Sequence, residues 1–183
     1  MKTLNRTSGF TLIELMITVA IAAIILTIAV PSFRIAILNN ERTIETNGFL
    51  GVLNLARSEA IKRGIKVEIC RSSDGSSCAS DNTGIWEDGW IVWSDQNNNS
   101  TLDTNEIIKV YSKLLNGFTL RTSTNLTQWI AYLPSGVSTG DNGLGTGTFR
   151  LCDSRGVDEA RFIVISTTGR SRVRTKESSD TCP

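Results

Sequence analysis

The run FTLIELMITVAIAAIILTIAV, from Phe10 to Val30, decides how this chain of 183 residues is organised. Its 21 residues contain a single charged side chain, that of Glu14. At about 1.5 Å of rise per residue, a helix over this run is about 31 Å long, which matches the hydrocarbon core of a bilayer. The run therefore predicts a membrane-spanning helix over residues 10–30.

The residues before this run indicate its orientation. Lys2 and Arg6 lie in the polar stretch MKTLNRTSG, and positive charge on that side favours a cytoplasmic N-terminus. A secretory signal peptide is the alternative, but its apolar core usually has about 7–15 residues and ends at small residues. Here the apolar run is longer, and the small residue, Gly9, precedes it. The pattern therefore favours an anchor that remains in the protein.

Glu14 needs a cationic partner, because an unpaired charge in a membrane segment costs at least a few kcal/mol. Cleavage after Gly9 would supply one, the new amino group of Phe10. Residues 9–14, GFTLIE, resemble the type III signal of type IV pilins and type II secretion pseudopilins. The resemblance implies that prepilin peptidase removes the leader, residues 1–9, and methylates Phe10. It also implies that Glu14 aligns each subunit with its neighbour's N-terminus in a fibre of major and minor pilins.

Helical periodicity continues beyond Pro31, a position where pilins often carry a helix-kinking proline. Apolar side chains recur every three or four residues and predict an amphipathic continuation over 31–64. They are Ile35, Leu38, Phe49, Val52, Leu53, Ala56 and Ala60. Lys62 and Arg63 followed by Gly64 are typical of a helix C-terminus. We therefore expect one helix from about Phe10 to about Arg63, with its second half packed on a sheet.

From Ile65 onward, runs of β-branched and aromatic residues alternate with breaks rich in Gly, Asn, Asp and Ser. They predict strands near residues 65–71, 90–94, 107–111, 118–122, 129–133, 148–152, 161–166 and 170–175. The Gly-rich run 140–147 lacks the strand-to-helix context of a phosphate loop, so we expect a hairpin loop there. The fold class is therefore α+β: one long N-terminal helix packed on a β-sandwich-like head over residues 65–183, the pilin fold that the resemblance implies.

Three later stretches resemble the GspH/FimT branch of this family, which contains FimT/FimU and type II secretion protein H-like minor pilins. They are RSEAIKRG at 57–64 with VEIC at 67–70, GWIVWSD at 89–95 with the Asn-rich run 97–106, and FIVISTTGR at 162–170. The resemblance implies a minor pilin of a type IV pilus, made in the inner membrane with a single span and a periplasmic head, then assembled into the fibre. The alternative is a type II secretion system pseudopilin that acts only in pseudopilus assembly and protein secretion.

Composition argues against catalysis and against binding by bulk charge. The chain has 19 Lys and Arg, 18 Asp and Glu, and no histidine. Without histidine it has no Ser-His-Asp or Cys-His catalysis and no histidine metal site. With a net charge of +1, any nucleic-acid or membrane-surface binding requires a local patch. We therefore expect a structural and interaction protein, with no enzymatic activity and no cofactor.

The four cysteines, Cys70, Cys78, Cys152 and Cys182, allow three pairings. In the periplasm, where the head is expected, disulfides persist. Proximity in the sequence favours Cys70 with Cys78, and Cys152 with Cys182 then follows. A zinc site is the rival interpretation, but the spacings do not fit CxxC pairs. The second disulfide would attach the C-terminal tail to the head.

A local basic patch lies before Cys182: Arg170, Arg172, Arg174 and Lys176. On a strand the arginines would share one face, about 7 Å apart, and would suit bidentate phosphate contacts. No aromatic residue interleaves them, so the pattern indicates sequence-independent binding to a nucleic-acid backbone. Protection of an edge strand against unwanted pairing is the alternative. GRSR at 169–172 resembles the Gly-Arg-x-Arg element of FimT-type receptors, which implies double-stranded DNA as a partner in natural transformation.

A candidate calcium loop lies at residues 95–106, where oxygen-bearing side chains occupy EF-hand positions one, three, five, nine and twelve. These side chains are Asp95, Asn97, Asn99, Asp103 and Glu106. Ser100 stands where such loops usually have glycine, and predicted strands flank the run instead of helices. An Asn- and Asp-rich hairpin turn explains the same residues without a metal ion.

Overall fold

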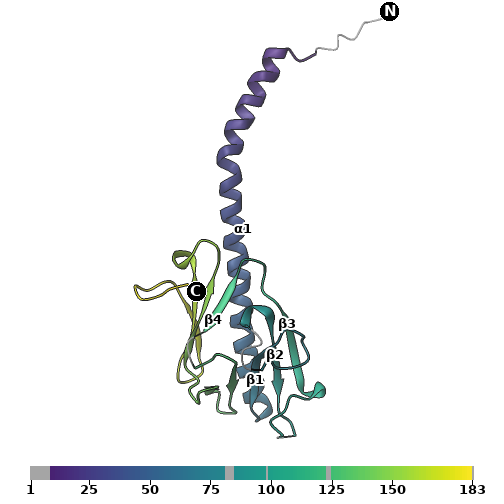
Figure 1. The fold of residues 1–183 in the computed structure, drawn as a ribbon, viewed down its shortest axis with the longest axis vertical. Coiled ribbons are helices and arrows are strands. Elements are labelled where there is room, and N and C mark those ends of the chain that lie inside the picture. Colours follow the sequence, from purple (N-terminus) through teal and green to yellow (C-terminus); the bar gives the residue numbers. More distant parts are fainter. Residues whose placement is uncertain (1–8, 81–84, 98, 123–124, 183) are drawn as a thin grey trace, which may run out of the picture. The chain divides into compact units, whose positions relative to one another are not determined.

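The computed structural model describes residues 9–80, 85–97, 99–122 and 125–182 (Figure 1). The predicted leader, apart from Gly9, lies outside these residues. The chain divides into two compact units, residues 1–40 and residues 41–183. The predicted boundary between the helix and the head, at residue 64, therefore differs from this division, because the last turns of the helix belong to the core of the second unit.

In the first unit, helix α1 (Leu12–Arg63) begins after Thr11, whose Oγ1 accepts the backbone N–H of Glu14 at 3.2 Å. The hydroxyls of Thr18 and Thr27 donate to helix carbonyl oxygens three residues earlier, at 2.8 and 2.6 Å. The hydroxyls of the apolar run are thus bonded within the helix, as a membrane environment requires. The helix is long and apolar enough to span a membrane, and none of its most apolar window is buried within the protein.

The second unit combines the rest of α1 with two antiparallel sheets, ordered β3-β2-β1-β5-β6 and β4-β7-β8-β9. The strands are β1 Val67–Arg71, β2 Gly89–Ser94, β3 Ile107–Ser112, β4 Thr119–Thr122, β5 Trp129–Tyr132, β6 Ser138–Gly140, β7 Gly147–Cys152, β8 Arg161–Ile165 and β9 Ser171–Arg174. Short 3₁₀ helices, η1 Trp86–Asp88, η2 Thr104–Glu106 and η3 Val157–Glu159, precede β2, β3 and β8. The predicted α+β architecture, one long N-terminal helix followed by an antiparallel β-rich head, is confirmed.

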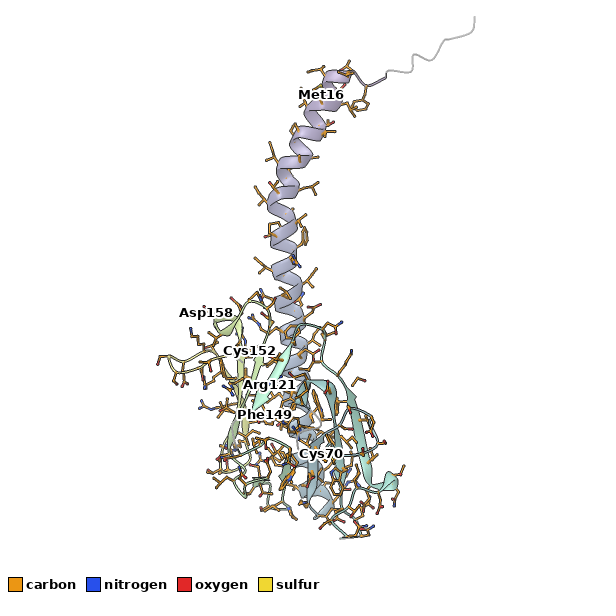
Figure 2. All side chains as sticks on the ribbon, viewed as in Figure 1. Met16, Cys70, Arg121, Phe149, Cys152 and Asp158 are labelled. Atoms are coloured by element: carbon orange, nitrogen blue, oxygen red, sulfur yellow. A yellow bond between two sulfur atoms is a disulfide. The ribbon has the colours of Figure 1, made fainter. Side chains whose placement is uncertain are left out.

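One apolar core joins α1 to the inner faces of both sheets. Phe49 of α1 connects them: its ring centre lies 5.0 Å from that of Trp90 in β2 and 4.6 Å from that of Phe149 in β7, which Figure 2 labels. The predicted helix stripe is buried at Phe49, Val52, Leu53, Ala56 and Ala60. The prediction is wrong for Ile35, which is 53% exposed because it precedes the head's core.

One further feature of the head, strand β6, differs from the sequence predictions. β6 was not predicted, because the three residues Ser138–Gly140 carry no apolar pattern; their strand is defined by pairing with β5. Trp93 lies on the face of its sheet opposite α1, in a small cluster with Cys70 and Ile91. The alternation of side chains along β2 places Trp90 inside and Trp93 outside.

Candidate functional site

The predicted basic strand forms the free edge of the four-stranded sheet. Among the described strands β9 pairs with β8 alone, with Arg172 opposite Val164 and Arg174 opposite Phe162. Arg170 precedes β9 and lies in the hairpin turn, where its carbonyl oxygen accepts the N–H of Ser166 at 2.9 Å. The expectation that three arginines form one row on a strand is therefore wrong for Arg170. Arg172 and Arg174, two residues apart on β9, do share a face.

Arg170 and Arg172 present their side chains to solvent. Neither guanidinium has an ion-pair partner within the part of the chain that the structure describes. Both groups are therefore available to an anionic ligand, and Arg172 stands on a strand edge where a linear ligand can approach.

Arg174 has a different environment. Its guanidinium lies 4.7 Å from the ring centre of Phe162 and donates to both carboxylate oxygens of Asp180, with Nη2 3.0 Å from Oδ1. Its Nε lies 3.4 Å from a carboxylate oxygen of Glu177. The hydrogen bonds from Arg174 lower the pKa of Asp180 to about 2. Arg174 thus holds the C-terminal tail and, in this structure, already binds a carboxylate.

Lys176 is also paired, since its Nζ lies 2.7 Å from a carboxylate oxygen of Asp158. The Asp158 side chain is 80% exposed, so this ion pair is open to solvent and easily exchanged. Of the four residues predicted to bind DNA, two contact carboxylates and two have no ion-pair partner in the part of the chain that the structure describes. That division depends on where the tail returns to the sheet, which local sequence does not encode.

The turn that carries Arg170 is held by close packing. Gly169 adopts φ +74°, and a Cβ there would lie 2.2 Å from the carbonyl oxygen of Gly136. Arg57 of α1 donates from Nε to that same oxygen at 2.9 Å and from Nη2 to the carbonyl oxygen of Thr168 at 3.1 Å. One arginine thereby fixes hairpin turns of both sheets. Arg57 opens the helix-end stretch at 57–64, but sequence reasoning assigned it no role.

The structure contains both disulfides of the predicted pairing. Cys70 is bonded to Cys78 and Cys152 to Cys182, and the described residues include no free cysteine. The first closes a short loop after β1. The second joins the end of β7 to the C-terminal tail, so it holds Asp180 close to the sheet that carries Arg174.

The candidate calcium loop is closed by its own hydrogen bonds. The Asp95 carboxylate accepts the backbone N–H groups of Asn99 and Ser100 at 3.0 and 2.8 Å. The side-chain amides of Asn97 and Asn99 both donate to the Asp103 carboxylate, at 2.7 and 3.1 Å. Ser100 has φ +58°, the left-handed conformation expected where glycine is usual.

Glu106, the last calcium candidate, is buried and serves the backbone. Its Oε1 accepts the N–H groups of Gln96 and Asn97 at 2.7 and 3.2 Å, and it forms a capping box with Asp103 at the start of η2. Among the described residues no group of three acidic, cysteine or histidine side chains is placed to hold a metal ion. The arrangement supports the alternative interpretation, an Asn- and Asp-rich turn.

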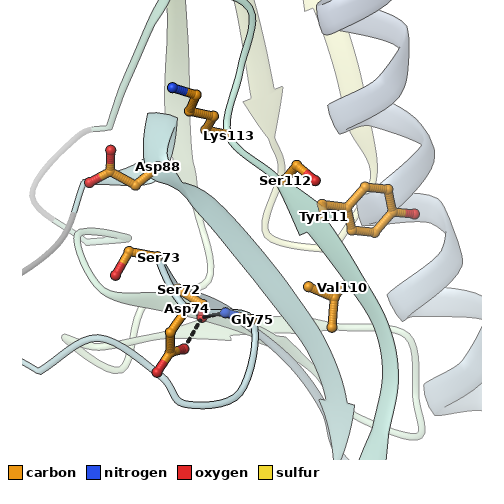
Figure 3. Close-up of a pocket in the computed structure, with 9 residues that line it drawn as sticks. All are labelled: Ser72, Ser73, Asp74, Gly75, Asp88, Val110, Tyr111, Ser112 and Lys113. Atoms are coloured by element: carbon orange, nitrogen blue, oxygen red, sulfur yellow. Dashed lines mark hydrogen bonds between the residues drawn. The ribbon is translucent and has the colours of Figure 1, made fainter.

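A surface cavity of about 310 Å³ lies beside the Cys70–Cys78 loop (Figure 3). It is lined by Ser72, Ser73, Asp74, Gly75, Asp88, Val110, Tyr111, Ser112 and Lys113. The Asp74 carboxylate accepts the N–H groups of Ser76 and Ser77, both at 2.9 Å, and these bonds hold its pKa well below the usual range. Asp74 therefore shapes the loop and is not available as an acid or base.

The residues of the predicted processing and assembly site are all solvent-exposed. Gly9 has no atom within 4 Å of the position its Cβ would take, and Phe10 is 79% exposed. The Glu14 side chain is exposed on the first turn of α1.

Comparisons with known proteins agree on the fold and the family. A family profile described as type II transport protein GspH matches residues 45–169, and one for the prokaryotic N-terminal methylation motif matches residues 4–30. No curated protein sequence matches the chain.

Two solved structures share the fold. The type IV minor pilin FimU of Pseudomonas aeruginosa aligns at 19% identity and TM-score 0.56, over 78% of this chain and 93% of that one. The minor pseudopilin EpsH of the Vibrio cholerae type II secretion system aligns at 16% identity and TM-score 0.54, over 78% of this chain and 99% of that one. A pilus protein and a secretion protein thus resemble the chain to nearly the same degree.

Proposed function

The chain belongs to the GspH family of type II transport proteins, and we propose that within it the chain acts as a minor pilin of a type IV pilus that binds DNA. The N-terminal methylation motif implies processing by prepilin peptidase before assembly with other pilins. The apolar part of α1 serves as membrane anchor first and as fibre core after assembly. The cytoplasmic N-terminus and periplasmic head are part of the proposal and rest on Lys2 and Arg6.

The observation that carries DNA binding is the pair of exposed guanidiniums of Arg170, in the hairpin turn, and Arg172, on the edge strand, which have no ion-pair partner among the described residues. Arginine binds phosphate bidentately, and backbone contacts of this kind need no base recognition. The turn before them is held rigidly through Arg57, so the two groups are presented without a large loss of backbone entropy on binding.

A second candidate is a type II secretion pseudopilin without DNA binding. Two observations favour it: the matched family carries the type II transport description, and Arg174 and Lys176 are already neutralised by carboxylates. In that role Arg170 and Arg172 would protect the edge strand or contact a neighbouring subunit.

DNA titration of the full chain in non-ionic detergent micelles, at two or more salt concentrations, distinguishes the two functions. Two phosphate contacts predict a slope of log affinity against log salt of about −1.8, with little sequence preference. The double variant Arg170→Gln/Arg172→Gln should lose that binding. The matched control, Lys62→Gln/Lys113→Gln, removes the same charge elsewhere on the head and should retain most of it.

The outcome decides the function directly. Salt-dependent binding that disappears only in the arginine variant supports the DNA-binding pilin. If the unchanged protein shows no binding even at low salt, the DNA proposal fails and the pseudopilin becomes the better assignment. Equal losses in both double variants would indicate bulk charge and would also contradict a specific role for β9.

A further inference from the structure

The outer face of the four-stranded sheet carries a row of arginines that crosses several strands. Arg174 of β9 lies opposite Phe162 of β8, Phe162 opposite Arg150 of β7, and Arg150 opposite Arg121 of β4. Directly opposed residues lie on the same face of a sheet. The next row, which includes Leu151 of β7, faces the core. The three arginines therefore lie on the outer face, where Figure 2 labels Arg121.

Carboxylates compensate this row of like charges unequally. Arg121 forms an ion pair with Glu87, and Arg174 forms one with Asp180. Arg150 has no ion-pair partner among the described residues; its Nη2 lies 3.4 Å from the carbonyl oxygen of Thr122. The pKa of Asp180 is lowered mainly by the hydrogen bond from Arg174, and the charge of Arg150 lowers it further, so both arginines act on the same carboxylate.

The Asp180 carboxylate occupies a partly buried anion-binding site formed by Arg174 over the ring of Phe162. The Arg174 side chain is 18% exposed and the Asp180 side chain 13% exposed, and both carboxylate oxygens receive hydrogen bonds from the guanidinium. The ring of Phe162 supports the guanidinium from beneath. This planar, two-bond geometry is the one by which arginine also binds phosphate. Asp180 reaches the site because Cys182, two residues later, is bonded to Cys152 of β7.

We propose that Arg174 and Arg150 form a phosphate site on the outer face of this sheet, and that the Asp180 carboxylate occupies it until a nucleic-acid phosphate displaces it. The inference rests on the proposed DNA binding and extends it. DNA then follows a path from Arg172 on the edge strand inward across the sheet to β7. The tail acts as an internal competitor that weakens binding, at high local concentration because the disulfide tethers it.

The Asp180→Asn variant tests the site, because asparagine keeps the size of the side chain and one acceptor oxygen for the tail. In the same salt-dependent DNA titration of the full chain, we expect affinity to rise about two- to fivefold at low salt, the range for one added ion pair. The salt slope should steepen by about 0.9 for each additional phosphate that the variant neutralises.

The matched control is Asp158→Asn. It removes one negative charge from an exposed residue that contacts Lys176, without opening the Arg174 site. We expect it to raise affinity less than Asp180→Asn does. Adding Arg150→Gln to Asp180→Asn should cancel most of the increase, although Arg150 lies two strands away from β9.

Several results would overturn the inference while leaving the proposed function intact. One is an equal increase in DNA affinity in Asp180→Asn and Asp158→Asn, and another is an unchanged affinity in Asp180→Asn. A third is an increase in affinity that remains after Arg150→Gln is added. In each case, binding would still require Arg170 and Arg172. Binding by neither the unchanged protein nor Asp180→Asn would reject both proposals. Mass spectrometry of the Cys152–Cys182 bond and thermal melting would verify that each variant is folded. The single variant Arg150→Gln tests the site without altering the tail.

Discussion

The Nε–H of Arg57 donates to the carbonyl oxygen of Gly136 at 2.9 Å, and this bond attaches the turn between β5 and β6 to helix α1. The same guanidinium bonds the carbonyl oxygen of Thr168, in the turn between β8 and β9. The two turns belong to different sheets, and a Cβ at Gly169 would strike the Gly136 oxygen. Arg57 therefore joins both sheets to the helix at the turn that presents Arg170.

We predict that Arg57→Gln lowers the free energy of unfolding by about 1–3 kcal/mol, because two carbonyl oxygens lose a charged donor. Arg57→Lys should recover only part of the loss, since an ammonium group lacks the guanidinium fork that reaches both oxygens. Urea titration of each variant measures the difference. Full recovery by lysine would show that charge alone matters at this position.

Gly169→Ala should destabilise the head by more than the roughly 1–2 kcal/mol that a left-handed backbone costs an alanine. The added Cβ would lie 2.2 Å from the Gly136 oxygen, so the two turns would have to separate. Gly143→Ala is the control, because Gly143 has φ +75° but no atom within 4 Å of the Cβ position. The melting temperature of Gly169→Ala should lie well below that of Gly143→Ala. Similar melting temperatures would contradict the close approach of the two turns.

Glu14 lies in the first turn of α1, and its charge is predicted to act in assembly. The Thr11 hydroxyl accepts the Glu14 N–H, and Gln replaces Glu well at this helix position. Glu14→Gln should therefore leave the helix start intact but remove the charge that is predicted to neutralise a neighbour's N-terminus. We expect Glu14→Gln to be excluded from fibres in an assembly assay. If Glu14→Gln enters fibres at the same level as the unchanged protein, the predicted role of the charge is rejected.

Glu68 makes the head's stability depend on pH. It lies on β1, only 8% exposed, and burial raises its pKa above 4.5 even though Lys66 contacts it at 2.9 Å and lowers it. The nearby Asp95 carboxylate raises it further. As pH rises above 4.5, the unfolded chain loses this proton before the folded chain does, so folding becomes less favourable. We expect Glu68→Gln to melt above wild type at pH 7 and to match it below pH 4.5.

Glu59 gives the control with the opposite sign. Hydrogen bonding from Arg63 lowers its pKa below 4.5, against the effect of burial and together with the charge of Lys62. Its stabilisation is therefore present at neutral pH and lost as pH falls below 4.5. Glu59→Gln should melt slightly below wild type at pH 7, with the difference vanishing in acid. Differential scanning fluorimetry over pH 3–8 measures the melting temperature of both variants. If the melting temperature of Glu68→Gln differs from that of wild type by the same amount at every pH, burial of the Glu68 charge does not control the pH dependence.

Features encoded within a few neighbouring residues were predictable. The apolar run at 10–30, the end of α1 at Arg63 and most strands follow from hydropathy and periodicity, which act over one or two turns of chain. The Cys70–Cys78 pairing followed from proximity in the sequence, and it left only one partner for Cys152. Family resemblance was carried by equally local stretches, above all residues 9–14.

Partners that lie far apart along the chain were decided by tertiary structure. Arg57 meets Gly136 because two hairpins of different sheets converge on one helix face, 79 residues apart in sequence. Arg174 is occupied because the Cys152–Cys182 disulfide returns the tail, with Asp180, to the sheet, whereas Arg172 has no ion-pair partner among the described residues. The sequence of the basic stretch does not distinguish Arg172 from Arg174, since both are arginines on one strand. Sheet register and a covalent crosslink determine which of these charges can meet a ligand.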